Sequence, residues 1–552
     1  MMSGVVNLDM SRTSTDYNTI IIGAGHNGLT TGIYLADAGM RPLILERNDE
    51  VGGAIRSGEI TEEGFVHDIY STNQNLFLAS DLFEDYGEEL ARHGLEFEVT
   101  DKPFCNVFPN DQCLRVYADE ERTFEELREH HPADLEGWKR LYQKFGRFAD
   151  TLLPLLDTTL PSWKAVRILA SAVRKEGVTG VTELGQLALE SPRQLGDAYF
   201  ETEEAKILIA AWGLHLDFGP DVSGGAMIPV VESFGAMQEG MAMCKGGSSN
   251  ISESLAALFE EKGGTIEKNA EVTDIHVADG QVSGVSTADG DNYSANQVVA
   301  NLTPQVLFDN LIPEWAVSKE FTSQVEGFDY GPGTMMIHCS ADSLPDWRAG
   351  DNIDEFMYVH IAPYVSDLAE TYTKAVNGVI PESPMVVVGQ TTAVDPSRTP
   401  NDEDILWIQV RALPSRIEGD AAGEIEATDW DEAKDPVANR VMAKIEEYAP
   451  GLSDCIRERV VLSPDDLEAS NPNLVGGDSS GGSHHLSQNF IWRPVSGYSQ
   501  YKMPVDGLYM VGAGTWPGGG NNATSGHLAA QRMLGPTRSE RVFDRIWSLT
   551  GR

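Results

Sequence analysis

The feature that most restricts the fold of this 552-residue chain lies between residues 17 and 46. Two short apolar runs, Thr19–Ile22 and Pro42–Leu45, predict buried strands. The residues between them have a helical pattern over 29–38, and Gly39 is placed to end that helix. A G-x-G-x-x-G turn joins the first strand to the helix and consists of Gly23, Gly25 and Gly28. This order predicts a βαβ unit that binds a dinucleotide.

Each part of the unit has a physical role toward such a ligand. The glycines permit a tight turn, a close approach of pyrophosphate and close packing of helix on strand. The start of the helix offers free N–H groups and the positive end of its dipole to phosphates. Glu46 closes the second strand, where an acid accepts ribose hydroxyls and repels a 2′-phosphate. The alternative, a plain βαβ unit without nucleotide, is disfavoured because the full context of the fingerprint is present.

A second glycine turn follows directly. Arg47 opens the pattern R-x-x-x-x-G-G-x-x-x-S, which contains Gly52 and Gly53. The pattern resembles the FAD-binding amine oxidase and phytoene desaturase superfamily, in which the Gly-Gly turn lies against the flavin side of FAD. Many members carry Arg at the position of Ala54, and Arg56 is the candidate for that guanidinium contact here.

Two later stretches are similar to the same superfamily. The order of glycines, helix and short strands over 245–304 implies that the backbone of Val272 meets the adenine. The stretch 507–534 predicts a strand, then a glycine loop, then a helix that starts near Ala523. It resembles the C-terminal FAD motif of phytoene dehydrogenase-related proteins. Backbone N–H groups of such a loop hold phosphate or ribityl oxygens. The loop residues implied to contact FAD are Gly512, Gly514, Thr515, Gly518, Gly519 and Gly520.

The resemblance implies an α/β fold, with a Rossmann-like FAD-binding domain of the glutathione-reductase type and an inserted α+β substrate domain. We expect a flexible tail over 1–16, FAD-domain segments over 17–102, 245–330 and 483–552, and substrate-domain segments over 103–244 and 331–482. The chain contains one complete dinucleotide fingerprint, so FAD is the dinucleotide expected to bind tightly; a stable NAD(P) site would need a second such unit.

Charge excludes one class of partner. The chain carries 40 Lys and Arg against 85 Asp and Glu, a formal charge of −45, and repulsion of phosphates argues against a nucleic-acid role. The acid excess is either an ordinary solvated surface or an adaptation to a salty cytoplasm, and we favour the halophile hypothesis. Melting temperatures measured across a salt series test it, because the hypothesis requires them to rise with salt.

Cysteine spacing excludes further classes of site. None of the five cysteines forms a C-x-x-C pair, which argues against a dithiol reductase and a zinc ribbon, and no metal is expected. The first residues lack the basic start and apolar centre of a secretory signal, so we expect a cytoplasmic location with reduced thiols.

One segment differs from the acidic remainder of the chain. Residues 162–176 predict an amphipathic helix whose apolar face includes Trp163 and whose flanks carry Lys164, Arg167, Arg174 and Lys175. This composition is typical of a helix that lies on a membrane surface. A core helix with basic side chains snorkelling to solvent explains the pattern equally well. Peripheral membrane contact therefore remains open at this stage.

The resemblance implies a flavin-dependent dehydrogenase or desaturase, which moves hydride from a C–H bond of an apolar, isoprenoid- or carotenoid-like substrate to flavin N5. Amine oxidation and a non-redox isomerase or regulatory flavoprotein are the alternatives. The electron acceptor and a homo-oligomeric state are left open by the sequence.

The candidate catalytic residues are Arg493 and Tyr498, just before the last glycine loop, with a structural ion pair and a packed aromatic as the alternative roles. Three histidines are weaker candidates: His67 for facing the flavin, and His484 and His485 for a general base. Pocket-lining residues are expected among Trp212, His215 and Phe218.

Overall fold

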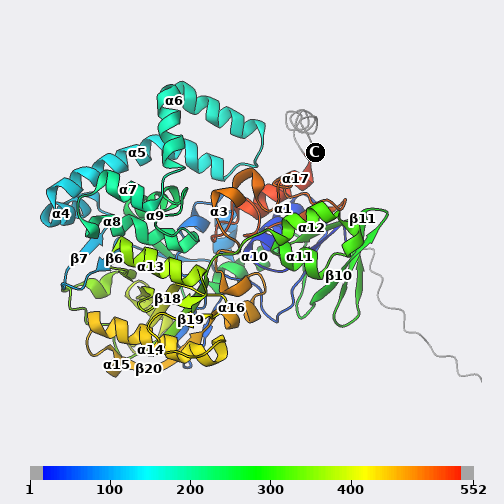
Figure 1. Cartoon of the computed structure of the whole chain (residues 1–552). Coiled ribbons are helices and arrows are strands. Elements are labelled where there is room, and N and C mark those ends of the chain that lie inside the picture. Colours follow the sequence, from blue (N-terminus) through cyan, green and yellow to red (C-terminus); the bar gives the residue numbers. More distant parts are fainter. Residues whose placement is uncertain (1–16, 536–552) are drawn as a thin grey trace, which may run out of the picture.

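The computed structural model describes residues 17–535 (Figure 1). The predicted tail over 1–16 and the end of the predicted last FAD-domain segment lie outside the described residues. The dinucleotide-type unit forms as expected: strand β1 leads through the glycine turn into helix α1 and then into strand β2. The bounds are Thr19–Ile22 for β1, His26–Asp37 for α1 and Pro42–Leu45 for β2.

A five-stranded parallel sheet contains this unit. Its strand order is β21-β13-β1-β2-β9, with Ile20 opposite Val298 on one side and Leu43 on the other. The strands come from three distant parts of the chain, which fall within the segments predicted for the FAD domain. The added bounds are Thr265–Glu267 for β9, Gln297–Ala300 for β13 and Leu508–Met510 for β21.

The two faces of this sheet have separate cores, because side chains alternate along a strand. Ile21 points into a core with α1, α3 (Asp81–Arg92), α10 (Ser249–Glu261) and α17 (Thr524–Leu534). Ile20 and Ile22 point into the other core, beneath a three-stranded antiparallel sheet and two short helices. Those elements are β10 (Val272–Ala278), β11 (Gln281–Thr287), β12 (Asn292–Ser294), α11 (Pro304–Asn310) and α12 (Lys319–Glu326).

A second sheet has seven strands in the order β20-β14-β18-β17-β15-β6-β7. In Figure 1, helices α7 (Pro192–Tyr199), α8 (Glu203–Ala210) and α9 (Met227–Glu239) lie above it, and α14 (Trp430–Tyr448) and α15 (Leu452–Cys455) lie below. Phe104 of β6 points to the upper core and Cys105 to the lower one. The strand bounds are Phe104–Val107 for β6, Cys113–Val116 for β7, Gly333–Ala341 for β14, Tyr358–Ile361 for β15, Met385–Gly389 for β17, Asp404–Leu413 for β18 and Ile456–Leu462 for β20.

The helices above this sheet form most of the first predicted substrate-domain segment, 103–244. Their bounds are Glu120–His130 for α4, Pro132–Leu156 for α5, Trp163–Leu187 for α6, Pro192–Tyr199 for α7, Glu203–Ala210 for α8, Ala211–Leu216 for the 3-10 helix η1 and Met227–Glu239 for α9. The remaining elements are α2 (Asn75–Leu78), α13 (Val365–Val376), α16 (Pro464–Ser470) and the strand pairs β3 (Ser57–Glu59) with β4 (Val66–Asp68), β5 (Phe97–Thr100) with β8 (Met241–Cys244), and β16 (Val379–Ile380) with β19 (Gly419–Asp420).

Helix α6 contains the basic segment and is longer than the predicted 162–176. Ser162 caps its start by accepting a hydrogen bond from the Ala165 N–H at 3.1 Å, as the sequence indicates. At Gly177 the backbone leaves helical geometry (φ 72°, ψ 178°), and the helix resumes to Leu187. Within residues 17–535, no helix is long and apolar enough to cross a membrane.

A buried ion-pair cluster joins the two parts of the molecule. The Arg398 guanidinium lies 2.9 Å from the Asp68 carboxylate and 3.1 Å from that of Asp395, and all three side chains are buried. The backbone N–H groups of Gly246 and Ser248 donate to Asp395 and Asp68. Burial alone would raise the pKa of Asp395, but hydrogen bonds from Ser397 and Gly246 and the Arg398 charge hold it below its ordinary value.

Candidate active site

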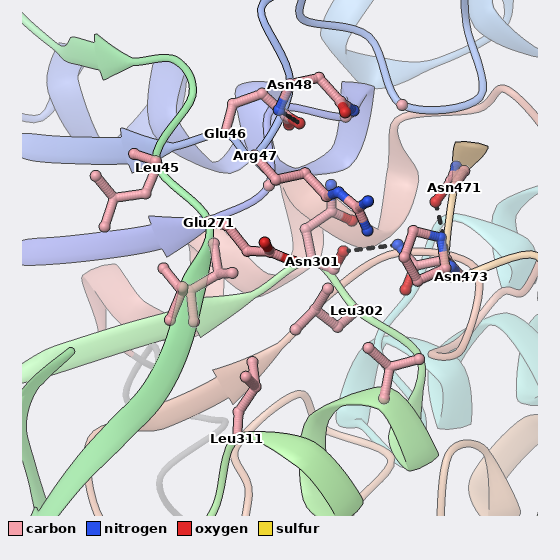
Figure 2. A pocket seen from close by; sticks show the side chains of 18 of the residues that line it. Leu45, Glu46, Arg47, Asn48, Glu271, Asn301, Leu302, Leu311, Asn471 and Asn473 are labelled. Carbon is pink, nitrogen blue, oxygen red and sulfur yellow. Dashed lines mark hydrogen bonds between the residues drawn. The ribbon is translucent and has the colours of Figure 1, made fainter. Parts of the chain in front are cut away.

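A cavity of about 400 Å³ opens at the carboxyl ends of β1 and β2 (Figure 2). It is lined by Gly23 and Gly25 of the turn, by Glu46 and Arg47 after β2, and by Val272 at the start of β10. In open α/β sheets, ligands bind at this end of the strands. The cavity therefore brings the residues predicted for the adenosine half of FAD into one place.

The glycines around this cavity are required by close approaches of the backbone. A Cβ atom added to Gly28 would lie 2.3 Å from the Gly23 carbonyl oxygen, and one at Gly52 would lie 2.4 Å from that of Ile55. At Gly512 it would lie 2.7 Å from the Asn301 Oδ1 atom. Real Cβ atoms do not approach this closely, so all three positions require glycine. The two glycine turns also meet directly, because the Gly52 N–H donates to the Ala24 carbonyl at 2.9 Å. The residues present fit an extended dinucleotide.

Helix α1 offers its N-terminus to the same cavity. Its N-cap is Gly25, which has no side chain to bond the first N–H groups, and the first turn carries no acid. These N–H groups would hold the pyrophosphate. Glu46 is fixed beside them, because its carboxylate accepts hydrogen bonds from the N–H groups of Ala24 at 2.7 Å and Asn48 at 3.0 Å.

A set of asparagines, which the sequence analysis did not single out, forms the opposite wall. The Asn473 side chain donates to the Asn301 carbonyl at 3.2 Å and accepts from the Thr303 N–H at 2.9 Å. Figure 2 shows Arg47 lying between β2 and the loop that carries Asn471 and Asn473. The Asn-Pro-Asn sequence at 471–473 is a turn signal, but the loop contacts the site only through tertiary folding.

A second cavity of about 150 Å³ continues from the first. Gly53 and Asn473 line the first cavity, and the next residues in the chain, Ala54 and Leu474, line the second. Gly520 of the C-terminal loop also lines the second cavity. The Gly-Gly turn and the C-terminal glycine loop therefore meet there, where the resemblance places the flavin half of FAD. We call this second cavity the chamber.

The chamber wall combines aromatic and polar side chains. Trp212, Tyr358 and Trp407 line it, and the last two rings are stacked with centroids 5.5 Å apart. Arg411 donates to Gln409 at 2.7 Å and to the Ser479 hydroxyl at 2.6 Å. His215 also lines the chamber, and burial lowers its pKa well below its ordinary value, so this ring is neutral. Trp212 and His215 are thus pocket residues, as predicted.

Two further cavities lead away from the chamber toward α6. The nearer one, of about 210 Å³, shares Leu76, Leu216 and Glu232 with the chamber and is also lined by Phe218. The outer one, of about 300 Å³, lies against Ala165 and Leu169 of α6. The residues that line both the nearer and the outer cavity are Leu156, Met227, Ile228, Val231, Phe490 and Trp516. We call the two cavities together the apolar passage.

The structure places the two catalytic candidates behind the glycine loops. Arg493 is fully buried and donates to the carbonyls of Ala513 and Ser483 at 2.7 Å each, and to that of Gly482 at 3.1 Å. It forms no ion pair with any described residue, in contrast to the structural alternative that the sequence suggested. Tyr498 packs its ring edge-on against Phe321, with centroids 5.1 Å apart. Neither side chain lines the chamber or the passage, and their catalytic roles stay predictions.

The other residues predicted to contact FAD have partners within the protein. Arg56 forms an ion pair with Glu50 at 2.9 Å. Thr515 is buried and donates to the Gly512 carbonyl at 2.8 Å, which fixes the C-terminal loop. The Gly519 N–H donates to the His484 ring at 2.9 Å, and a Cβ atom at Gly518 would lie 2.3 Å from the same ring. A Cβ atom at Gly514 would lie 3.0 Å from Pro304.

The histidine candidates have structural partners. The His67 ring lies 2.8 Å from the Thr61 hydroxyl, and burial, aided by His338 and Arg398, lowers its pKa to about 2. His484 supports Gly519, and burial lowers its pKa well below its ordinary value. The His485 ring lies 2.9 Å from the Asp217 carbonyl. Among residues 17–535, no cluster of side chains is suited to hold a metal ion.

Comparisons with known proteins agree with this geometry. A family described as flavin containing amine oxidoreductase matches residues 28–534. A rat protein, pyridine nucleotide-disulfide oxidoreductase domain-containing protein 2, is 27% identical, and the alignment covers 93% of each chain. A limonene dehydrogenase chain of Castellaniella defragrans is 26% identical over 94% of each chain. The 4,4'-diapophytoene desaturase (4,4'-diapolycopene-forming) of a Methylomonas species is 23% identical over 91% of each chain.

Solved structures share the fold. An oxidoreductase from Methanosarcina mazei matches with a TM-score of 0.59 at 15% identity, over 94% of this chain and 99% of that one. A triple mutant of putrescine oxidase matches with a TM-score of 0.59 at 14% identity, over 96% of this chain and 99% of that one. At these identities the likeness extends to the fold alone.

Proposed function

This chain belongs to the flavin containing amine oxidoreductase family, and from that premise we propose that it dehydrogenates an apolar, isoprenoid- or carotenoid-like small molecule. It is an FAD-dependent oxidoreductase of the amine oxidase and phytoene desaturase type. The bound flavin supplies the hydride-accepting chemistry. The chain supplies the two glycine turns that hold the dinucleotide and a chamber that orients the substrate and excludes water.

The observation that carries the proposal is the apolar passage. Its two cavities adjoin each other, the nearer one adjoins the chamber, and the outer one is lined by α6; the six residues that line both cavities are all apolar. Apolar ligands gain about 25 cal/mol for each Å² of surface removed from water, so such a channel selects hydrocarbon chains. Two relatives are named for limonene and for diapophytoene, and the proposal extends this class of substrate to the present chain.

Anaerobic reduction of the bound flavin tests the proposal. The wild-type holoenzyme is mixed with acyclic polyenes and monoterpenes, and with primary amines as the competing class, while flavin absorbance is followed. We expect the hydrocarbons to bleach the flavin. Ile228→Trp, which fills the passage, should slow bleaching by a long polyene about tenfold or more at unchanged FAD content. Val178→Trp, which adds the same bulk at an exposed position of α6, is the control.

Amine oxidation is the second candidate, because the chamber is more polar than the passage. Glu232 and the stacked Tyr358 and Trp407 rings line it, and a carboxylate beside aromatic rings also suits a cationic group. Bleaching by amines and not by hydrocarbons would support this candidate against the first. No bleaching by either class would support the non-redox alternative.

We also propose that α6 rests on an anionic membrane surface, from which an apolar substrate enters the passage. Val166, Leu169 and Val173 of α6 are 42–43% exposed, and Leu169 also lines the passage. Four basic residues flank this face in a chain of net charge −45: Lys164, Arg167, Arg174 and Lys175. Lys175 forms an ion pair with Asp150. In Figure 1, α6 lies at the outer edge of the molecule, beyond α5 and α7.

Flotation with vesicles that contain phosphatidylserine tests the membrane proposal. The wild type is expected to float with the vesicles and to be released by salt, because part of the attraction is electrostatic. Val166→Asp with Val173→Asp should abolish flotation. Val376→Asp, which changes a similarly exposed valine on α13, should leave it unchanged. A wild type that stays with the unbound fraction would refute membrane contact.

A further inference from the structure

Glu232 is the one acidic side chain that lines both the chamber and the adjoining part of the passage, among the residues that the structure describes. It lies on α9, in a stretch from Met227 to Met237 whose other residues are apolar or small. Ala54 and Gly520, from the two glycine loops that meet at the flavin end, line the same chamber. Glu232 therefore lines the space where substrate and flavin would meet.

The surroundings of Glu232 give it no structural task. No hydrogen bond or ion pair is formed by its carboxylate within residues 17–535, whereas the buried acids Asp68 and Asp395 are each held by Arg398 and a backbone N–H. Enclosure within the protein raises the pKa of Glu232 to about 7, and no charged neighbour contributes to that shift. An enclosed carboxylate without a partner costs stability, and such groups concentrate at functional sites.

Of the other ionisable groups of the chamber and the nearer cavity, Asp157 changes charge nearest to the pH at which Glu232 does. Burial keeps His215 and His484 neutral and raises the pKa of Tyr358. Burial lowers the pKa of Arg411 to about 10, so it stays charged. Burial and Asp81 raise the pKa of Asp157 to about 6, and Asp157 accepts a hydrogen bond from Thr524. The hydroxyl of Tyr70, which also lines the chamber, is hydrogen-bonded to that of Ser470.

We propose that the Glu232 carboxylate accepts the proton that leaves the substrate carbon next to the one that loses hydride. This role rests on the proposed dehydrogenation. In that reaction one C–H bond gives up a hydride, with its two electrons, to the flavin oxidant of the family. The neighbouring C–H bond gives its proton to a Glu232 oxygen, and its electron pair becomes the second bond of the new C=C. A base with a pKa near the working pH suits this transfer.

Flavin reduction by the best hydrocarbon of the panel, followed by stopped flow, tests the role. Below pH 7 the wild-type rate should increase about tenfold with each unit by which the pH rises, because only the ionised carboxylate accepts a proton. Above pH 7 the rate should level off. Glu232→Gln keeps the shape of the side chain; it should slow reduction about 10²-fold or more above pH 7 and remove the dependence of the rate on pH below 7. Glu232→Asp should recover part of the rate. Glu239→Gln, the same change at an exposed position of α9, is the control.

A second readout does not depend on turnover. In the resting holoenzyme, infrared difference spectra between pH 6 and pH 8 should show a carboxylic acid band that is lost on ionisation and is absent from Glu232→Gln. Bands of Asp157 and Asp217, in which burial raises the pKa to about 6, should remain in that variant. Wild-type reduction rates in Glu232→Gln would overturn this role and leave the proposed function intact. A wild type reduced by amines alone, or by neither class, would overturn both, because no proton would then leave carbon.

Discussion

Gly28→Ala is expected to yield a protein that binds FAD ten- to a hundredfold more weakly. The added Cβ atom would lie 2.3 Å from the Gly23 carbonyl oxygen, so helix α1 must move away from the glycine turn. Overpacking of this kind costs about 1–3 kcal/mol, and each 1.4 kcal/mol is a factor of ten in affinity. The displaced helix no longer aims its N-terminal N–H groups at the pyrophosphate. The measurement is the ratio of flavin to protein absorbance after purification, followed by a titration with FAD.

The matched control is Gly146→Ala on α5. A Cβ atom at Gly146 meets no atom within 4 Å, and alanine favours helix by about 1 kcal/mol over glycine. This variant should retain full FAD content and an equal or higher melting temperature. Full flavin occupancy in Gly28→Ala would contradict the placement of the pyrophosphate at the start of α1.

Arg398→Leu is expected to lower the free energy of unfolding by about 3–5 kcal/mol. The substitution leaves the Asp68 and Asp395 carboxylates buried without their cation, and it removes the hydrogen bond from Arg398 to the Cys244 carbonyl at 2.6 Å. The cluster joins a strand after the Gly-Gly turn, the loop before α10 and the substrate-domain loop at 395–398. The urea midpoint of unfolding measures the loss.

Two companion variants separate charge from packing. Arg348→Leu removes an arginine whose ion pair with Asp111 is half-exposed, and the free energy of unfolding should fall by no more than about 1 kcal/mol. Adding Asp68→Asn and Asp395→Asn to Arg398→Leu removes the unpaired charges and should restore part of the lost stability. An Arg398→Leu protein as stable as Arg348→Leu would show that the buried cluster does not hold the domains together.

The sequence predicts the nucleotide-binding part of the fold well because its signals are local. The strands Thr19–Ile22 and Pro42–Leu45 have the predicted bounds, and Gly39 ends the intervening helix with φ at +83°. Glycine turns, apolar runs and a capping serine such as Ser162 act over a few residues, so they can be recognised without the rest of the chain. The helix predicted over 162–176 ends where the backbone breaks at Gly177, but its resumption to Leu187 was not predicted.

The chamber was harder to predict because its residues come from distant parts of the chain. Glu232 lies among apolar residues of α9, and this isolated acid was the available signal. Arg411 and Trp407 lie on β18, and an apolar strand pattern does not distinguish side chains that face a cavity from those that pack in the core. Arg493 was predicted to be catalytic because of its position before the glycine loop, but its guanidinium donates to backbone carbonyls. Spacing along the sequence does not distinguish an arginine that contacts substrate from one that supports a loop.

The strand order of the parallel sheet has a consequence for synthesis on the ribosome. Strand β13 is paired on one side by β1, and its other edge is covered by β21, which the ribosome makes more than 200 residues later. Until then the nascent sheet exposes an open edge of the kind that promotes misassociation. The last strand and the glycine loop after it therefore have to leave the ribosome before a nucleotide is enclosed, so holoenzyme assembly follows the synthesis of β21 and depends on the supply of free cofactor.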